Sequence, residues 1–145
     1  MDTVTKRLLR FRHGSADGGA ATTELVLVTP LLILLALVAV AFGKLAGARL
    51  DADEAAHQAA RAASLARTPG QARTDAEAAA QRSLAEAGSS CTSPRVAPNL
   101  GGFDPGGTVR VTVTCRATLD VPGLHGVDVT ASAASVVDFY RGVES

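Results

Sequence analysis

Residues 18–43 read GGAATTELVLVTPLLILLALVAVAFG, and this stretch decides how the chain is built. Its last part, residues 25–43, carries no charged side chain. In a helix, a run of this length extends over roughly 28 Å, about the thickness of the hydrocarbon core of a bilayer. The stretch therefore predicts a helix that spans a membrane.

Charge is unevenly spread around this segment. The chain has 145 residues with 14 basic and 14 acidic side chains, and its net charge of zero argues against a nucleic-acid-binding protein, which usually carries a basic patch. Four basic residues precede the apolar run: Lys6, Arg7, Arg10 and Arg12. The positive-inside rule places this N-terminal part in the cytoplasm and the C-terminal part outside it.

Three kinds of segment can have this combination of basic residues and an apolar run. A cleaved secretory signal would use the small-x-small sites at residues 39–41 or 46–48, but its apolar core is usually only about 7–15 residues long. Glu24, directly before the apolar run, is also unusual for such a signal. An ordinary transmembrane anchor is the second kind. The third, a pilin-type signal, is the one that accounts for the residues around Glu24.

The acidic residue at the edge of the apolar run needs a partner, because a charge beside hydrocarbon is costly. A cut between Gly19 and Ala20 would make Glu24 the fifth residue of the mature chain. The new α-amine on Ala20 would be mostly cationic at neutral pH, so Glu24 of one subunit can pair with the amine of a neighbour and set the register between helices. The alternative for Glu24 is an acid that interacts with the helix dipole, which suits a plain anchor equally well.

The combination of a basic leader, Gly19, Glu24 and Pro30 resembles class III prepilin signals, and in particular the TadE/TadG-like proteins of tight adherence (Tad, Flp-type) pili. The chain departs from many of these relatives at Leu25, where they have Phe. The resemblance is specific over about residues 10–45. It implies a minor pilin or pseudopilin that a prepilin peptidase cuts between Gly19 and Ala20. Its implied partners are that peptidase, other pilins, the Tad membrane platform proteins and the lipid bilayer, with the secretion ATPase acting indirectly.

Residues 45–66 predict a helix that continues the membrane segment outwards. One apolar stripe at helical spacing consists of Leu45, Ala48, Ala52, Ala55, Ala59, Ala62, Ala63 and Ala66. Another face repeats every four residues: Arg49, Asp53, His57 and Arg61. After the break at residues 68–70, a second helix is predicted over residues 71–87, with Thr74 as N-cap, Glu77 at capping-box spacing and Gly88 as the stop.

Residues 88–145 have a β-rich composition. Residues 88–107 predict a loop with at most one short strand, whereas residues 108–115 alternate between apolar and polar types, as a half-buried strand does. The face of this strand that is predicted to be buried holds Val109, Val111, Val113 and Cys115. A second β-rich run covers residues 127–139, with Val127, Val129, Ala131 and Ala133 on one side. We expect an α+β fold in which a small antiparallel sheet packs on the alanine stripe.

The two cysteines, Cys91 and Cys115, lie in the part predicted to be exported, where disulfides form. A bridge between them would close a loop of about 25 residues and add roughly 3–3.5 kcal/mol of stability by the chain-entropy estimate. The alternative is two unpaired, partly buried thiols.

No catalytic or metal-binding constellation is predicted. The histidines are dispersed at positions 13, 57 and 125, and Asp53, Glu54 and His57 fit a solvated helix face better than a metal site. Asp120, His125 and Asp128 surround a loop without a nucleophile motif. The glycine pairs at residues 101–102 and 106–107 lack the lysine of a phosphate loop. We therefore expect no enzyme, no cofactor and no small-molecule substrate.

These predictions divide the chain into a basic leader (1–19), a transmembrane helix (20–43), extracytoplasmic helical segments (44–87) and a disulfide-linked β-rich region (88–145). The expected protein is a single-pass membrane protein with a cytoplasmic N-terminus, and the sequence leaves open whether it enters the pilus. The alternative is a membrane-anchored or secreted small binding module without a pilus role.

Overall fold

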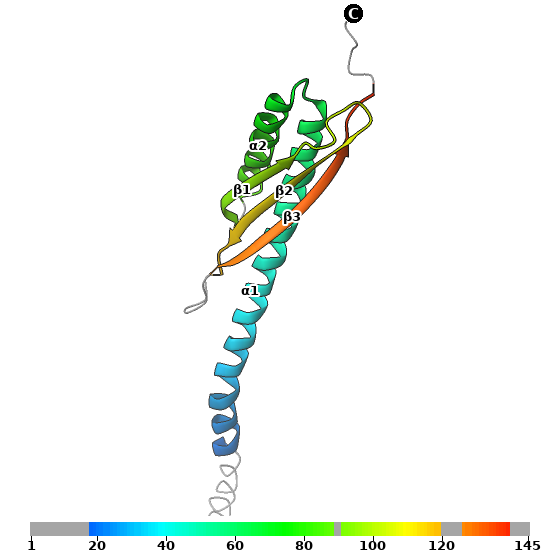
Figure 1. Cartoon of the computed structure of the whole chain (residues 1–145). Helices are drawn as coiled ribbons and strands as arrows, with labels where there is room; N and C mark the ends of the chain where they lie inside the picture. Colours follow the sequence, from blue (N-terminus) through cyan, green and yellow to red (C-terminus); the bar gives the residue numbers. More distant parts are fainter. Residues whose placement is uncertain (1–17, 89–90, 120–125, 140–145) are drawn as a thin grey trace, which may run out of the picture. The chain divides into compact units, whose positions relative to one another are not determined.

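A computed structural model describes residues 18–88, 91–119 and 126–139, with the backbone alone described for residues 18–25 and 27. Within these residues two helices precede three strands, in the arrangement drawn in Figure 1. The elements in chain order are α1 (Gly18–Leu65), α2 (Pro69–Glu86), β1 (Cys91–Asn99), β2 (Thr108–Ala117) and β3 (Val127–Val136). The chain divides into two compact units, Met1–Ala39 and Val40–Ser145. The predicted α+β class is confirmed.

The sheet is antiparallel, with the strand order β1-β2-β3. The pairing of β2 with β3 runs without interruption from Thr108 opposite Val136 to Ala117 opposite Val127. The register of β1 against β2 shifts between Thr92 and Arg95, where Ser93 has a positive φ of 51°. The alternation predicted for the central strand is confirmed, because its inward side chains are all buried: Val109, Val111, Val113, Cys115 and Ala117.

Within the second unit, α2 and the C-terminal part of α1 cover one face of the sheet (Figure 1). The helices contribute mainly alanines to the core and β2 contributes valines. The predicted alanine stripe is confirmed, although Leu45 and Ala62 are only half-buried and Ala56 and Ala60 widen it. Because alanine is small, the helices can lie close to the sheet, but each residue buries little apolar area.

The start of α2 differs from the prediction. Thr68, not Thr74, is the N-cap: its backbone is extended, and its Oγ1 accepts a hydrogen bond from the Gln71 N–H at 3.2 Å. Pro69 follows as the first helical residue, where a missing N–H costs nothing. Residues 68–70 therefore begin the helix as well as separating it from α1, because Thr-Pro is itself a helix-start signal. At the other end, Gly88 has a φ of 57° directly after the C-cap Ala87, as a helix stop does.

Strand β1 is longer than the short strand that the prediction allowed. It spans Cys91–Asn99 although it contains Pro94 and Pro98. Pairing with the regular strand β2 outweighs the low β-propensity of this segment, since strand formation depends strongly on cross-strand context. Prolines are tolerated there because β1 is an edge strand.

The loop between β1 and β2 contacts the chain just after β3. The Val137 N–H donates to the Gly107 carbonyl at 2.8 Å, and the Val137 carbonyl accepts from the Gly106 N–H at 3.0 Å. Gly106 has a φ of 79°, and a Cβ there would collide with the ring of Phe139. The positive φ favours glycine at this position, whereas the exposed ring of Phe139 can move away from an added Cβ.

Candidate membrane segment and processing site

The apolar stretch of α1 is exposed within the described structure. The side chains of residues 31–35 are between 57% and 64% exposed, although all five are leucine or isoleucine. The helix is long and apolar enough, from Val28 onwards, to cross a membrane by length and composition. A helix that presents large apolar side chains on all sides needs an apolar environment around it.

The predicted processing site lies at the start of this helix. Gly19 and Ala20 directly follow Gly18, the first residue of α1, so the backbone around the predicted cut is helical. Glu24 lies further along α1, and Pro30 is accommodated within it. The side chains of residues 18–25 are outside the described part of the structure, as is the leader up to residue 17 with His13. The cut and the role of Glu24 therefore stay predictions.

Cys91 and Cys115 form the predicted disulfide. The bridge joins the start of β1 to the buried face of β2 and belongs to a second apolar cluster, with Ala48, Ala52 and Val129. The Cys91 Sγ also lies 3.8 Å from the carbonyl oxygen of Ala48 on α1. The disulfide therefore secures β1 close to α1 and β2, at the point where the β1 register is irregular.

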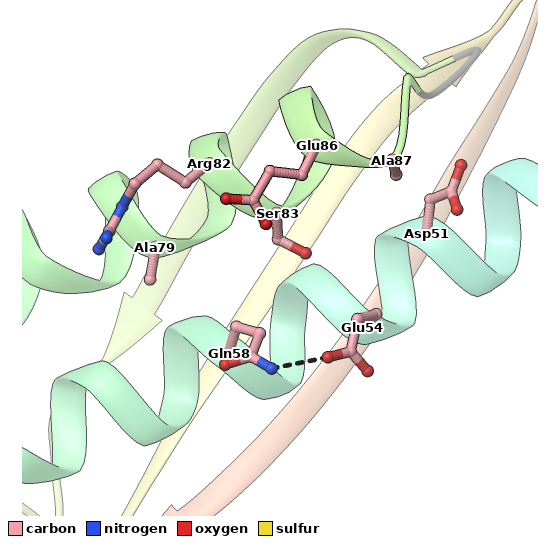
Figure 2. A pocket seen from close by; sticks show the side chains of 8 residues that line it. All are labelled: Asp51, Glu54, Gln58, Ala79, Arg82, Ser83, Glu86 and Ala87. Atoms are coloured by element: carbon pink, nitrogen blue, oxygen red, sulfur yellow. Dashed lines mark hydrogen bonds between the residues drawn. The ribbon is translucent and has the colours of Figure 1, made fainter.

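A shallow groove of about 540 Å³ lies between α1 and α2, and charged side chains of both signs line it. Figure 2 shows Gln58 and Glu54 on α1, joined by a hydrogen bond of 2.7 Å, across from Ser83 on α2. Asp51, Arg82 and Glu86 complete its charged lining. The groove depends on how the two helices pack, so no local pattern in the sequence indicates it.

The histidine and carboxylate sets considered in the sequence do not form a metal or catalytic site among the described residues. His57 lies 3.8 Å from Asp53, and both side chains are largely exposed, as expected for a solvated helix face. Asp128 lies 3.8 Å from Arg116 on the neighbouring strand, whereas Asp120 and His125 are outside the described residues. No group of three or more metal-ligating side chains that could hold an ion is found within residues 18–88, 91–119 and 126–139.

One polar contact in the core was not predicted. Ser64 on α1 is 4% exposed; its Oγ donates to the Arg61 carbonyl at 2.8 Å and accepts from the Ser135 Oγ of β3 at 3.0 Å. The hydroxyls satisfy each other where the alanine stripe meets the sheet, so the contact fixes α1 against β3.

Comparison with known proteins gives a match for the N-terminal part of the chain. The chain matches no curated protein and no solved structure. The family model described as TadE-like protein matches residues 19–61, less than a third of the chain. This family is a structural, pilus-related one. The matched residues hold the predicted cut, the apolar segment and the first turns of the alanine stripe, so the resemblance to TadE-like proteins seen in the sequence is confirmed for residues 19–61.

Proposed function

We propose that the protein is a TadE-like minor pilin or pseudopilin, a structural component of Tad pilus biogenesis and surface adhesion. The observation that carries the proposal is the family match over residues 19–61, which includes the exposed apolar stretch of α1. Residues 20–43 anchor the protein in the cell membrane, and the sheet and α2 form a small domain on the extracytoplasmic side. Its partners are other pilins and the Tad membrane platform proteins.

Processing is the first step of this function. The basic leader stays in the cytoplasm, and a prepilin peptidase cuts between Gly19 and Ala20. The cut frees the α-amine of Ala20, which is mostly cationic at neutral pH, and Glu24 of an adjacent subunit pairs with it. The pair offsets the cost of holding either charge beside hydrocarbon, and it fixes the axial register between neighbouring helices.

N-terminal sequencing of the membrane-extracted protein tests the cut. The expected mature chain starts at Ala20. A start at Met1, or one beyond Ala41, would contradict the proposal, because the first means no processing and the second means an ordinary secretory signal.

The register role has its own test, in cells that assemble the pilus. Glu24→Ala should abolish assembly while the protein still inserts in the membrane, and Glu24→Gln should behave in the same way because it also removes the charge. Normal piliation with Glu24→Ala would exclude the register role. If residues 1–44 can be replaced by an unrelated anchor without loss of function, the protein is instead a membrane-anchored binding module.

A further inference from the structure

The two edges of the sheet differ in their ability to accept another strand. β1 contains Pro94 and Pro98 and a register shift. Prolines and irregular pairing are devices that protect a sheet edge from further strands. β3, at the other edge, has no proline, carries one charged residue, Asp128, and pairs with β2 without interruption. The β3 edge therefore lacks the protection that β1 has.

The backbone of β3 offers hydrogen-bonding groups on this open side. Both main-chain groups of Val137 bond to the loop that precedes β2, so they point to the β2 side. The direction alternates from one residue to the next along a strand, so the even-numbered residues of β3 direct their N–H and C=O groups away from β2. All of these residues are exposed: Asp128, Thr130, Ser132, Ala134 and Val136. Among the residues that the structure describes, no strand pairs with this edge.

A groove lies beside one part of the open edge. Its volume is about 520 Å³, and it lies between Ala134 and Ser135 of β3 and the exposed flank of α1. The flank contributes polar side chains with hydrogen-bond donors and acceptors: Glu54, His57, Gln58 and Arg61. Because successive side chains of a strand point to opposite faces, a strand added to β3 would place every second side chain above this flank.

We propose that the open edge of β3 binds an extended segment of a partner polypeptide by strand addition, a mode in which main-chain hydrogen bonds provide affinity and alternate side chains provide specificity. The segment carries polar side chains at the positions that face Glu54, Gln58 and Arg61. The inference depends on the fold of residues 40–139 and not on processing at Gly19, so either can fail without the other.

A substitution at Ala134 isolates the main-chain contribution. Ala134→Pro removes an N–H that points away from β2, and the fixed φ of proline is compatible with an edge strand. Ala134→Val is the matched control, because it retains the N–H at the same exposed position. The probe is a fluorescent peptide with the sequence of residues 108–117 and Cys115→Ser, which already has the side-chain pattern of a strand that pairs with β3. Anisotropy with the detergent-solubilised full chain should show saturable binding, at least tenfold weaker for Ala134→Pro and unchanged or tighter for Ala134→Val.

A second arm uses the unaltered chain, so it decides the question even if the proline variant fails to fold. N-methyl groups on every second amide of this peptide remove the N–H donors along one of its two edges. Two such peptides, methylated on opposite edges, are compared, and the one methylated on the edge that pairs with β3 should not bind. Retention of the Cys91–Cys115 disulfide and an unchanged circular dichroism spectrum show that a variant is folded. Equal affinity of folded Ala134→Pro and the parent chain, or binding that is insensitive to N-methylation of either edge, would overturn the proposal. So would the absence of saturable binding.

Discussion

The two parts of α1 differ in the size of their apolar side chains and in how far these side chains are exposed. Residues 31–35 are large aliphatic side chains that are at least 57% exposed, whereas Ala52, Ala55 and Ala59 are fully buried. In the C-terminal part, small side chains allow the sheet and α2 to lie against the helix. The large side chains of the N-terminal part have no such cover among the described residues. The residue size along one helix therefore separates a segment suited to lipid from one suited to a protein core.

A charge in the exposed stretch should have the largest effect on the protein. Ile33→Arg replaces a side chain that favours membrane insertion with one that opposes it, at a cost of about 3–4 kcal/mol at the centre of a span. The expected result is loss of the protein from the membrane fraction after alkaline extraction. Leu50→Arg is the matched control, because Leu50 is 71% exposed and lies beyond the predicted span. If both variants stay in the membrane equally, residues 25–43 are not the span.

Removal of the disulfide should affect only the second unit. The double substitution Cys91→Ser and Cys115→Ser frees a loop with a sequence separation of 24 residues and should cost about 3 kcal/mol of unfolding free energy. Chemical denaturation of the detergent-solubilised chain measures this loss. Membrane extraction should be unchanged, in contrast to Ile33→Arg. A denaturation midpoint equal to that of the parent chain would show that β1 is held by strand pairing alone.

The alanine stripe is sensitive to side-chain size. Ala59→Leu adds methylene groups where the side chain is fully buried, and overpacking of this kind costs about 1–3 kcal/mol. Ala78→Leu makes the same exchange at an exposed position of α2 and should leave the unfolding free energy almost unchanged. The same size increase is expected to be harmless in the exposed part of α1. Equal stability of the two variants would mean that the helices and the sheet do not pack tightly at Ala59.

Buried faces that depend on residues close together in the sequence were predicted correctly, and several features that depend on tertiary packing were not. The alternation of residues 108–115 and the spacing of the alanine stripe identified the buried faces, because a periodic pattern over several residues reflects the side that meets the core. The sequence predicts β1 as shorter than it is, because its prolines are typical loop signals and its pairing depends on the distant strand β2. The open edge of β3 and the Ser64–Ser135 contact depend on tertiary packing, which no local pattern of residues reports.

The smallest expected effect on stability comes from removing the hydroxyl of one of two threonines near the start of α2. The hydroxyl of Thr68 caps the helix, so Thr68→Ala should cost about 1 kcal/mol, or a melting temperature about 4–8 °C lower. Thr74 lies inside the helix, where its hydroxyl donates to the Gly70 carbonyl at 3.3 Å. A bond of this type competes weakly with helix geometry, and alanine has the higher helix propensity. Thr74→Ala should therefore be neutral or slightly stabilising. Thermal unfolding should show a lower melting temperature for Thr68→Ala and an unchanged or slightly higher one for Thr74→Ala. The reverse order of melting temperatures would restore the capping box at Thr74 and Glu77 and move the start of α2 to residue 75.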